Sequence, residues 1–390
     1  MPPFTSASRV EHIQAPVIPI VAQWIRETPG TLSLGQGVVY YGPPKTIGKK
    51  IQEFMRDPAL NKYGAVNGDF ELRRLIQLKL QKEEGIDVSL GRKLMVTAGG
   101  NMAFSHAIFA LCNPGDEVIL PLPFYFNHEM AIQLAGCVPV LVPTDANYQL
   151  QLGRIRKAIT PKTRAIVTVS PNNPTGVIYP QEDLFQLNQL CRRKKLFHIH
   201  DAAYEYFSYG GNIPSNPLSF PDSTSHTISL HSLSKSYGFA SWRIGYMVYP
   251  EALYESMRKI QDTHLICPSL IAQYAACAAL EAGKLYSTQQ LPAIQRSRDI
   301  FLEELSTISS ICQVPESNGA FYFLLKIDTD LSSMELVERL IREHKVATIP
   351  GSTFGLTEGC YIRIAYGSLQ ETQAKVGIGR LVKGLQAILG

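Results

Sequence analysis

The chain has 390 residues, a formal net charge of +4, 45% hydrophobic residues and 18% charged residues. A single core seldom grows beyond about 250–300 residues, so this length predicts a globular protein with more than one domain. The densest basic run, at residues 192–195, is expected to complement the dipole at the end of a helix. The charge pattern therefore requires no nucleic-acid partner.

No segment has the features of a targeting or membrane sequence. The first five residues, Met-Pro-Pro-Phe-Thr, lack the basic and apolar regions of a secretory signal, and no apolar run approaches the ~20 residues that span a bilayer. The seven cysteines are dispersed without a CxxC pair, which is typical of reduced thiols. We therefore expect a cytoplasmic protein without a membrane partner.

Residues 1–45 mix proline, glycine and short apolar runs. Gly35 and Gly37 flank Gln36, and such glycines allow a close approach of the backbone to a ligand. Beyond this segment, one helix is predicted from Ile47 and another over residues 69–84, where apolar residues recur near helical spacing.

From residue 93 onward, short β-branched runs alternate with helical patterns. Strands are predicted at 94–97, 117–120, 138–142, 165–169, 197–201 and 227–230, with helices ending at Leu111 and spanning 127–135, 151–159 and 182–194. This alternation predicts an α/β three-layer sandwich, in which helices cover both faces of a mostly parallel central sheet. Ligands of such sheets bind beyond the carboxyl ends of the strands.

After Pro250 the pattern is helical to about residue 309, and it continues as a smaller α+β part. Strands are predicted at 320–325, 346–349 and 361–364, with helices at 333–344 and from Thr372. We therefore predict a large domain of residues 46–280 and a small domain formed by residues 1–45 and 281–390. The crevice between the two is the expected ligand site.

The stretch from Ser232 to Arg243, Ser-Leu-Ser-Lys-Ser-Tyr-Gly-Phe-Ala-Ser-Trp-Arg, suggests a specific chemistry. A nearby cation and partial burial lower the pKa of an ammonium group, which favours Lys235 as a nucleophilic amine. The hydroxyls of Ser232 and Ser234 and the guanidinium of Arg243 suit a phosphate monoester. Together they suggest a Schiff base between Lys235 and a phosphate-bearing aldehyde, pyridoxal 5′-phosphate (PLP).

This stretch also resembles that of the class I/II aminotransferases, a family of fold-type-I PLP enzymes. The resemblance extends to Ser-Pro-Asn-Asn-Pro-Thr-Gly at 170–176, and it implies that Asn173 donates to the phenolate oxygen of the cofactor. It further implies that Asp201 pairs with the pyridine nitrogen and that Tyr204 binds the same phenolate. The family often has an acidic residue after this aspartate, whereas this chain has Ala202.

Other cofactor contacts follow from the same resemblance. Tyr125 is expected to stack on the cofactor ring, with Phe124 as the rival. The amides of Gly100 and Asn101 open a helix after a strand and would bind the phosphate. Tyr63 matches the tyrosine that reaches the phosphate from a neighbouring subunit, which implies a homodimer with shared active sites.

The substrate carboxylate is expected at Arg363. An arginine on an apolar strand is costly to bury unless it is paired, and a carboxylate is a good bidentate partner. The alternative is a structural salt bridge. The resemblance implies that Asn173 and the backbone amide of Gly37 assist Arg363.

The predicted reaction moves an amino group from an L-amino acid to a 2-oxo acid, with Lys235 as general base. The chain has Asn101 where some family members have a lysine for a second carboxylate, and residues 262–269 contain no lysine or arginine. With Tyr40, Tyr41 and Ile266 expected near the pocket, a neutral or aromatic donor is favoured over aspartate. This region resembles the kynurenine/glutamine transaminase branch, although the histidine of that branch falls at Ile266.

Several alternatives remain on the sequence alone. A PLP-dependent C–S lyase, a ring-forming synthase or an aspartate-type aminotransferase would use the same lysine, aspartate and arginine. A non-catalytic PLP-binding regulator would carry a DNA-binding module, which is not expected ahead of Gly35, and a nucleotide-binding protein would need a phosphate-loop motif that is missing. His198 and His200 lie on one face of a strand, but without a third ligand they are interpreted as packing residues, and no metal is predicted.

Overall fold

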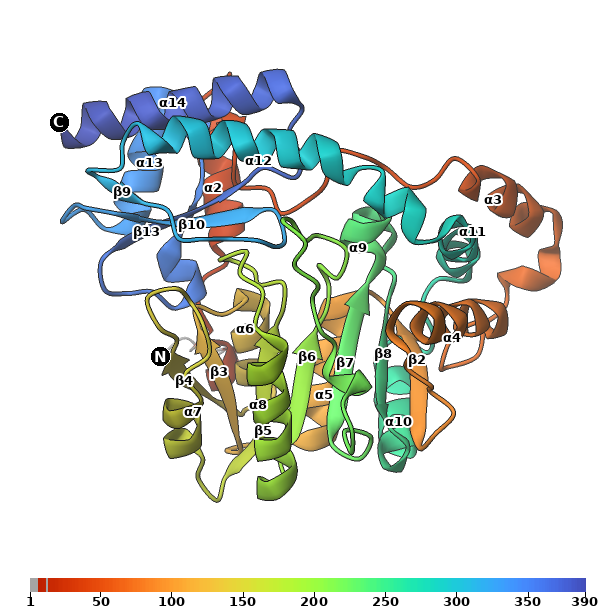
Figure 1. Cartoon of the computed structure of the whole chain (residues 1–390). Coiled ribbons are helices and arrows are strands. Elements are labelled where there is room, and N and C mark those ends of the chain that lie inside the picture. Colours follow the sequence, from red (N-terminus) through yellow and green to blue (C-terminus); the bar gives the residue numbers. More distant parts are fainter. Residues whose placement is uncertain (1–5, 12) are drawn as a thin grey trace.

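The computed structural model describes residues 6–11 and 13–390, and its largest element is a seven-stranded sheet (Figure 1). Its strands are β2 (Arg92–Thr97), β3 (Glu117–Leu122), β4 (Val138–Pro143), β5 (Thr163–Val169), β6 (Phe197–Asp201), β7 (Thr227–Ser232) and β8 (Gly245–Pro250). The strand order is β2-β8-β7-β6-β5-β3-β4. Every strand predicted between residues 94 and 230 is present, and the mostly parallel sheet is confirmed.

Helices cover both faces of this sheet, as the sequence predicted. The large helices are α3 (Ile47–Arg56), α4 (Phe70–Glu84), α5 (Gly100–Leu111), α6 (Phe126–Leu134), α7 (Leu152–Ala158), α8 (Gln181–Lys194), α10 (Tyr254–His264) and α11 (Leu270–Thr288). Neighbouring residues of β5 point to opposite faces: Val167 shares a buried cluster with Phe104 of α5, and Ile166 shares another with Leu187 of α8. The central layer is therefore buried on both sides.

The ends of α4 show how local sequence sets an element. The carboxylate of Asp69 accepts a hydrogen bond from the backbone N–H of Leu72 at 3.0 Å, which satisfies one free donor of the first turn. Gly85 then adopts φ 67°, a left-handed conformation that ends the helix at little cost for glycine. The predicted helix over residues 69–84 is confirmed.

Strand β8 is a difference from the sequence expectation, because no strand was predicted at residues 245–250. It runs antiparallel to both β2 and β7 and separates them. All six of its residues are buried, and its sequence, Gly-Tyr-Met-Val-Tyr-Pro, contains a single β-branched residue between a glycine and a proline, which is a weak strand signal.

A second, smaller set of sheets lies above the first in Figure 1. It contains β9 (Cys312–Gln313), β10 (Tyr322–Ile327), β12 (Ile349–Pro350) and β13 (Cys360–Ala365), in the order β12-β13-β10-β9. A separate parallel pair joins β1 (Leu32–Ser33) to β11 (Val346–Ala347), so the N-terminal segment is attached to the C-terminal part.

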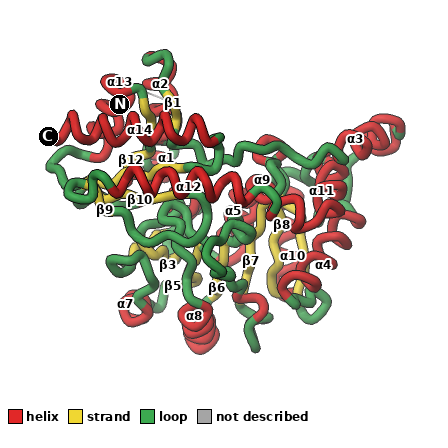
Figure 2. Tube along the Cα trace, turned by 45° about the horizontal axis from the view of Figure 1, so that its top comes forward, coloured by secondary structure: helices red, strands yellow, loops and turns green. Residues whose placement is uncertain are grey.

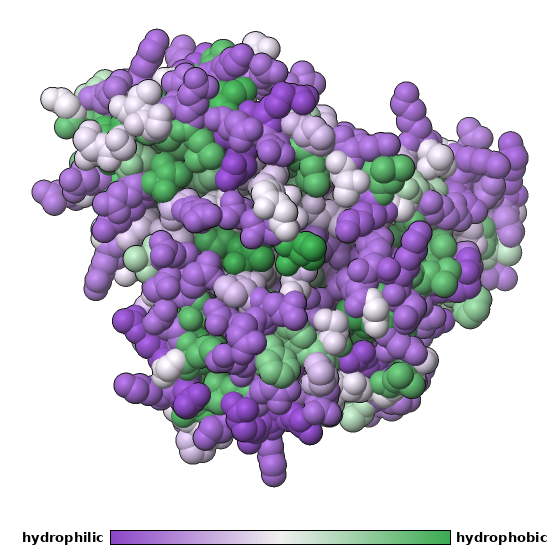
Figure 3. All heavy atoms as spheres, in the orientation of Figure 1, coloured by the Kyte–Doolittle hydropathy of each residue, from purple (hydrophilic) through white to green (hydrophobic). Residues whose placement is uncertain are grey.

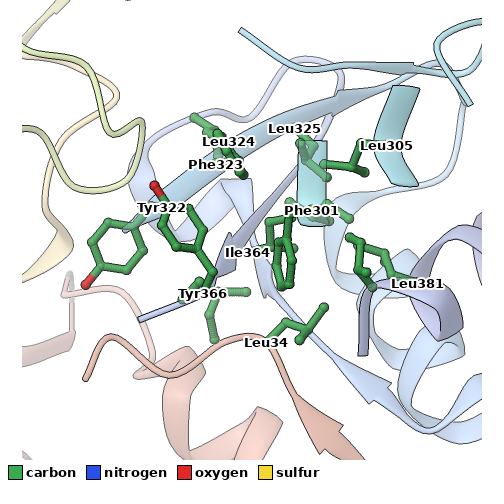
Figure 4. Packing of buried hydrophobic residues seen from close by; sticks show 14 of the residues in the cluster. Leu34, Phe301, Leu305, Tyr322, Phe323, Leu324, Leu325, Ile364, Tyr366 and Leu381 are labelled. Carbon is green, nitrogen blue, oxygen red and sulfur yellow. The ribbon is translucent and has the colours of Figure 1, made fainter. Parts of the chain in front are cut away.

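Helices α12 (Leu291–Ser306), α13 (Ser333–His344) and α14 (Glu371–Leu389) pack on these strands, and α12 runs beside α14 (Figure 2). Phe301 of α12, Leu381 of α14 and Ile364 of β13 meet in one buried cluster that also contains Leu34 (Figure 4). A further helix, α2 (Val17–Glu27), lies in the segment of residues 1–45, where the sequence had indicated none.

The remaining helical elements are short. They are α1 (Ser8–Glu11), η1 (Pro58–Asn61), η2 (Pro217–Ser219), α9 (Leu233–Ser236), η3 (Ala240–Trp242), η4 (Glu251–Leu253) and η5 (Gly351–Phe354). Of these, α9 and η3 flank the candidate site described below.

Strand β4 forms an exposed edge of the large sheet. The N–H of Val138 points inward, to the carbonyl of Asp116 beside β3. Because successive residues of a strand alternate in direction, the backbone positions of Pro139, Leu141 and Pro143 point outward. Two of the three outward positions therefore lack an N–H donor.

Among the helices described, none is long and apolar enough to cross a membrane. On the face shown in Figure 3, polar residues predominate and apolar residues gather in separate patches. All seven cysteines are free thiols, and five of them are buried.

Candidate active site

Two adjoining cavities lie where the parallel strands end, and both are lined by Tyr125, Asn173, Tyr204 and Lys235. The inner cavity, of about 100 Å³, is lined by Gly100, Asn101, Tyr125, Val169, Asn173, Asp201, Ala203, Tyr204, Ser232, Ser234, Lys235 and Arg243. The outer cavity, of about 310 Å³, is lined by Ile18, Val21, Ala22, Ile25, Ser33, Gly35, Gln36, Gly37, Val38, Tyr125, Phe126, Asn173, Tyr204, Lys235, Tyr322, Ile349 and Arg363.

The topology of the sheet explains why these residues meet. Asp201 is the last residue of β6 and Ser232 the last residue of β7, while Asn173 lies in the turn after β5. The three strands are adjacent and parallel, so their carboxyl ends lie at one edge. All predicted cofactor residues except Tyr63 line the inner cavity, and Gly37, Asn173 and Arg363 line the outer one.

Lys235 lies on α9, a single turn that directly follows β7. Burial lowers the pKa of its ammonium from 10.5 to about 8; Asp201 opposes this shift, and Arg243 and Arg363 add to it. The hydroxyl of Tyr41 donates to the backbone carbonyl of Lys235 at 2.9 Å. The backbone of Lys235 is therefore held in place, and its amine can lose its proton near neutral pH.

Several residues that line the inner cavity offer hydrogen-bond donors or hydroxyls. The amino end of α5, at Gly100 and Asn101, has no capping side chain among the described residues, so its first N–H groups are available. A Cβ atom at Gly99, which has φ 82°, would lie 2.3 Å from the Arg243 guanidinium, so only glycine leaves room for that side chain. This set, with Ser232 and Ser234, fits a phosphate group.

The inner cavity is also lined by Asp201, which is buried. Burial raises the pKa of Asp201, but the hydrogen bond and charge of His128 and the N–H of Ala203 outweigh it, and the pKa falls below 3.8. His128 Nε2 lies 3.1 Å from Asp201 Oδ2, and the N–H of Ala203 donates to Oδ1 at 3.0 Å. A buried, ionised carboxylate in the same cavity as these phosphate donors fits the ring nitrogen of PLP.

Sequence reasoning missed His128, although it lies in the stretch already examined for Tyr125. Its ring stacks on Phe104 with centroids 4.0 Å apart, which fixes the imidazole against Asp201. A single histidine gives no signal of this role in the sequence, because its contact with Asp201 arises only when α6 is packed beside the end of β6.

Asn173, Tyr204, Tyr322 and Arg363 form a continuous polar chain between the two cavities. Arg363 Nη1 donates to Asn173 Oδ1 at 2.9 Å, and Asn173 Nδ2 donates to the Tyr204 hydroxyl at 3.2 Å. The Tyr204 and Tyr322 hydroxyls are 2.9 Å apart. Sequence analysis missed Tyr322, which reads as one apolar residue in a buried strand.

Arg363 lies on β13 and its side chain is buried. Its Nη2 donates to the carbonyl of Gly35 at 2.7 Å, and its guanidinium lies over the rings of Tyr322 and Phe354. No carboxylate of the described residues pairs with it, and its buried Nε has no hydrogen-bond partner there. The described residues therefore provide no structural salt bridge for Arg363, and its charge remains available for an anionic ligand.

The rest of the outer cavity is mainly apolar. Helix α2 contributes Ile18, Val21, Ala22 and Ile25, and Val38 and Phe126 add to the wall. Tyr40, Tyr41 and Ile266, which the sequence placed near the pocket, line neither cavity. The Tyr40 hydroxyl instead donates to Gln290 Oε1 at 2.8 Å.

Three other sequence candidates can be located. Tyr125 lines both cavities, whereas its rival Phe124 is buried in a core cluster. Tyr63 is 82% exposed and lines neither cavity of its own chain. His198 and His200 each contact the Thr168 hydroxyl at 2.8 Å, which supports their interpretation as packing residues.

Known proteins resemble this chain over nearly its whole length. Residues 29–381 match the family described as aminotransferase class I and II. An aromatic aminotransferase, ISS1, of Arabidopsis thaliana is 33% identical over 96% of this chain and 94% of its own. A probable aspartate/prephenate aminotransferase of Aquifex aeolicus is 33% identical over 98% and 99%. The crystal structure of an aromatic aminotransferase from Pyrococcus horikoshii OT3 matches with a TM-score of 0.87, 30% identity and coverage of 94% and 99%.

Proposed function

Because the chain belongs to the class I and II aminotransferases, we propose that Lys235 carries its cofactor and serves as the base of its reaction. The protein is a PLP-dependent aminotransferase, which moves an amino group from an amino acid to a 2-oxo acid. When bound, PLP supplies an electron sink for the bonds at the substrate Cα. The assignments of individual residues below are proposals.

The inner cavity would hold the cofactor. The N–H groups of Gly100 and Asn101, the hydroxyls of Ser232 and Ser234 and the guanidinium of Arg243 would bind its phosphate. Asp201 would pair with the ring nitrogen, Asn173 and Tyr204 would bind the phenolate oxygen, and Tyr125 would stack on the ring. The ionised state of Asp201 in a buried site supports this arrangement.

Lys235 would move the proton. Lys235 lines both cavities, and a pKa of about 8 allows its amine to lose and regain a proton near neutral pH. The position between the two cavities supports a role on an atom that is shared by the cofactor and the substrate. Tyr204 is the third predicted catalytic residue.

Arg363 would bind the substrate α-carboxylate, together with Asn173 and the N–H of Gly37. The observation that carries this proposal is a buried guanidinium with no carboxylate partner among the described residues. A charged group is very costly to bury without a counter-charge, so an anionic ligand is expected to complete the site.

We further propose a neutral or aromatic amino donor. Apolar side chains form most of the outer wall, and the cationic residues that line the two cavities are Lys235, Arg243 and Arg363. A second carboxylate would stay unpaired there, at a cost of about 1–3 kcal/mol. The names of the Arabidopsis and Pyrococcus proteins support an aromatic donor, whereas that of the Aquifex protein points to aspartate or prephenate.

The predicted domains, assembly and location are proposals as well. The large sheet lies within residues 46–280 and the smaller sheets within 1–45 and 281–390, which supports the two predicted domains. The exposed position of Tyr63 supports a homodimer in which it reaches the site of the partner. The seven free thiols support a cytoplasmic location.

Two measurements test the function. Borohydride reduction of the PLP-loaded protein, followed by peptide mass analysis, should find the cofactor fixed on Lys235, and the label should be lost in Lys235→Ala. A label on another lysine would overturn the assignment.

A panel of half-reactions should then give a higher kcat/KM for phenylalanine, methionine, glutamine or kynurenine than for aspartate. A preference of about tenfold for aspartate, or roughly 1.4 kcal/mol, would contradict the proposed donor. Release of pyruvate and ammonia without a 2-oxo acid would indicate a lyase.

A further inference from the structure

Tyr322 is the first residue of β10, and its side chain is fully buried at one edge of the cluster in Figure 4. Its hydroxyl lies 2.9 Å from the Tyr204 hydroxyl, and its ring lies 4.7 Å from the Arg363 guanidinium. A Cβ atom at Gly37 would come within 2.7 Å of this hydroxyl, so the glycine leaves the space that the hydroxyl occupies. Tyr322 thus contacts both Tyr204, which is proposed to bind the cofactor, and Arg363, which is proposed to bind the substrate.

The donors and acceptors in the polar chain of Arg363, Asn173, Tyr204 and Tyr322 can be assigned by starting from Arg363. A guanidinium can only donate, so the oxygen of the Asn173 amide must face Arg363, where the distance is 2.9 Å. The amide nitrogen then faces Tyr204 and donates to its oxygen at 3.2 Å. Arg363 therefore fixes the amide orientation that a structure alone leaves ambiguous.

The remaining question is the direction of the bond between the two tyrosines. Tyr204 has one hydroxyl hydrogen, and if it donated to Tyr322, none would remain for the inner cavity. Within the described residues, the Tyr322 hydroxyl has no hydrogen-bond partner besides Tyr204. Burial raises the pKa of Tyr322 to about 12, so it keeps its proton and can donate.

We propose that Tyr322 is a positioning residue, whose hydroxyl donates to Tyr204 and thereby directs the single hydrogen of Tyr204 to the phenolate oxygen of the bound cofactor. A hydrogen bond to an anion is stronger than one between neutral groups, so a phenolate in the cavity favours this direction. Linked hydrogen bonds also polarise one another, so the Tyr322 donor strengthens the donation by Tyr204. The inference rests on the proposed function, because it requires the phenolate at Tyr204.

The test is the pH titration of the visible absorbance of the cofactor in the holoenzyme. A hydrogen-bond donor to the phenolate oxygen stabilises the deprotonated form of the bound cofactor. Because loss of this donor removes that stabilisation, it raises the apparent pKa of the cofactor. Tyr204→Phe should raise it most, and Tyr322→Phe should raise it by roughly 0.5–1 unit, the scale of one hydrogen bond. An unchanged titration in Tyr322→Phe, beside a shift in Tyr204→Phe, would overturn the inference.

The matched control is Tyr366→Phe. Tyr366 is fully buried in the same cluster and lines neither cavity, and its hydroxyl has no hydrogen-bond partner in the described part of the chain. The cofactor of this variant should have the same apparent pKa as that of the wild type. If its pKa shifts as much as in Tyr322→Phe, the loss of any tyrosine hydroxyl from this core has the same effect, and the role proposed for Tyr322 is not specific.

A double variant separates a direct from a structural role. If Tyr322 acts through Tyr204, adding Tyr322→Phe to Tyr204→Phe should leave the titration of Tyr204→Phe unchanged. Two independent shifts that add would overturn the inference while leaving the proposed function intact. A wild-type protein without a cofactor band bound through Lys235 would instead refute the proposed function, and this inference with it.

Discussion

At the scale of single residues, the site depends on buried charges whose partners are set by distant strands. Asp201 stays ionised because His128 and the N–H of Ala203 outweigh its burial. We expect Asp201→Asn to retain PLP through the phosphate donors but to slow proton abstraction at Cα by about 10² or more, the loss that follows removal of one preorganised charge. Rapid-mixing kinetics of single half-reactions measure this rate, with Asp299→Asn on the exposed side of α12 as control. A near-normal rate would remove Asp201 from the proposed role.

Arg363 gives a second prediction, because its geometry matters as much as its charge. In Arg363→Lys the charge remains, but the paired donors that suit a carboxylate are lost. Since a hydrogen bond to a charged group contributes about 1.5–3 kcal/mol, KM for the amino acid should rise roughly 10- to 150-fold. Steady-state kinetics measure it, and the matched control is Arg298→Lys, whose guanidinium packs on Tyr209 and Phe323 away from both cavities. If KM for the amino acid rises equally in Arg363→Lys and Arg298→Lys, Arg363 does not bind the substrate carboxylate.

Lys235 links catalysis to stability. Its folded-state pKa of about 8 lies below the usual 10.5, so folding disfavours the ammonium form. This penalty is fully present below pH 8, shrinks between pH 8 and 10.5, and vanishes above that window. Cofactor-free Lys235→Met should therefore exceed the wild type in unfolding free energy by up to about 3 kcal/mol at pH 7. Urea unfolding at pH 7, 9 and 10.5 tests this, and a difference independent of pH would contradict it.

At the scale of elements, α2 sets the character of the outer cavity. Ile18 is 40% exposed, so a polar replacement there should not disturb the core. We expect Ile18→Arg to add a cation at the cavity wall and to lower the kcat/KM ratio of phenylalanine to aspartate by about tenfold, the effect of roughly 1.4 kcal/mol. Gln23→Arg, which adds the same charge on the exposed side of α2, should leave the ratio unchanged. Equal ratios in the two variants would contradict a specificity role for α2.

The element scale also shows what the sequence could and could not predict. The parallel strands were predictable because short runs with apolar and β-branched residues alternate with helical patterns, and their carboxyl ends brought Asn173, Asp201 and Lys235 together. Strand β8, Gly-Tyr-Met-Val-Tyr-Pro, was missed because it begins with glycine, ends with proline and contains a single β-branched residue. Helix α2 was missed because prolines interrupt its segment at residues 16 and 19. His128 and Tyr322 were missed because their roles arise from contacts between elements far apart in sequence.

At the scale of the whole molecule, the exposed Tyr63 suggests a site that one chain cannot complete. We expect Lys235→Ala and Tyr63→Ala to be nearly inactive alone but to recover activity after subunit exchange. Each site would combine Lys235 of one chain with Tyr63 of the other chain. In a mixed dimer, one site therefore contains both substituted residues, and the other site contains the native Lys235 and the native Tyr63. With random exchange, half of the dimers are mixed and each has one intact site, so activity should reach about a quarter of wild type.

Steady-state assays before and after exchange measure the recovery, and sedimentation velocity confirms that the dimers form. Exchange of each variant with itself is the control and should recover nothing. If Tyr63 acted within its own chain, the mixed dimers would also recover nothing. A fully active monomer would contradict the shared site altogether.

The outer edge of β4 has a consequence for how the molecule behaves when crowded. A sheet edge with a regular row of donors is a template on which other chains can polymerise. Here prolines occupy two of the three outward positions, so an incoming strand would find a donor only at Leu141. Although Val138 and Leu141 leave this edge partly apolar, the row of N–H donors that a regular ladder needs is interrupted at two of its three positions. The prolines of β4 therefore disfavour the addition of further strands on this side and, with it, growth of the sheet into fibrils.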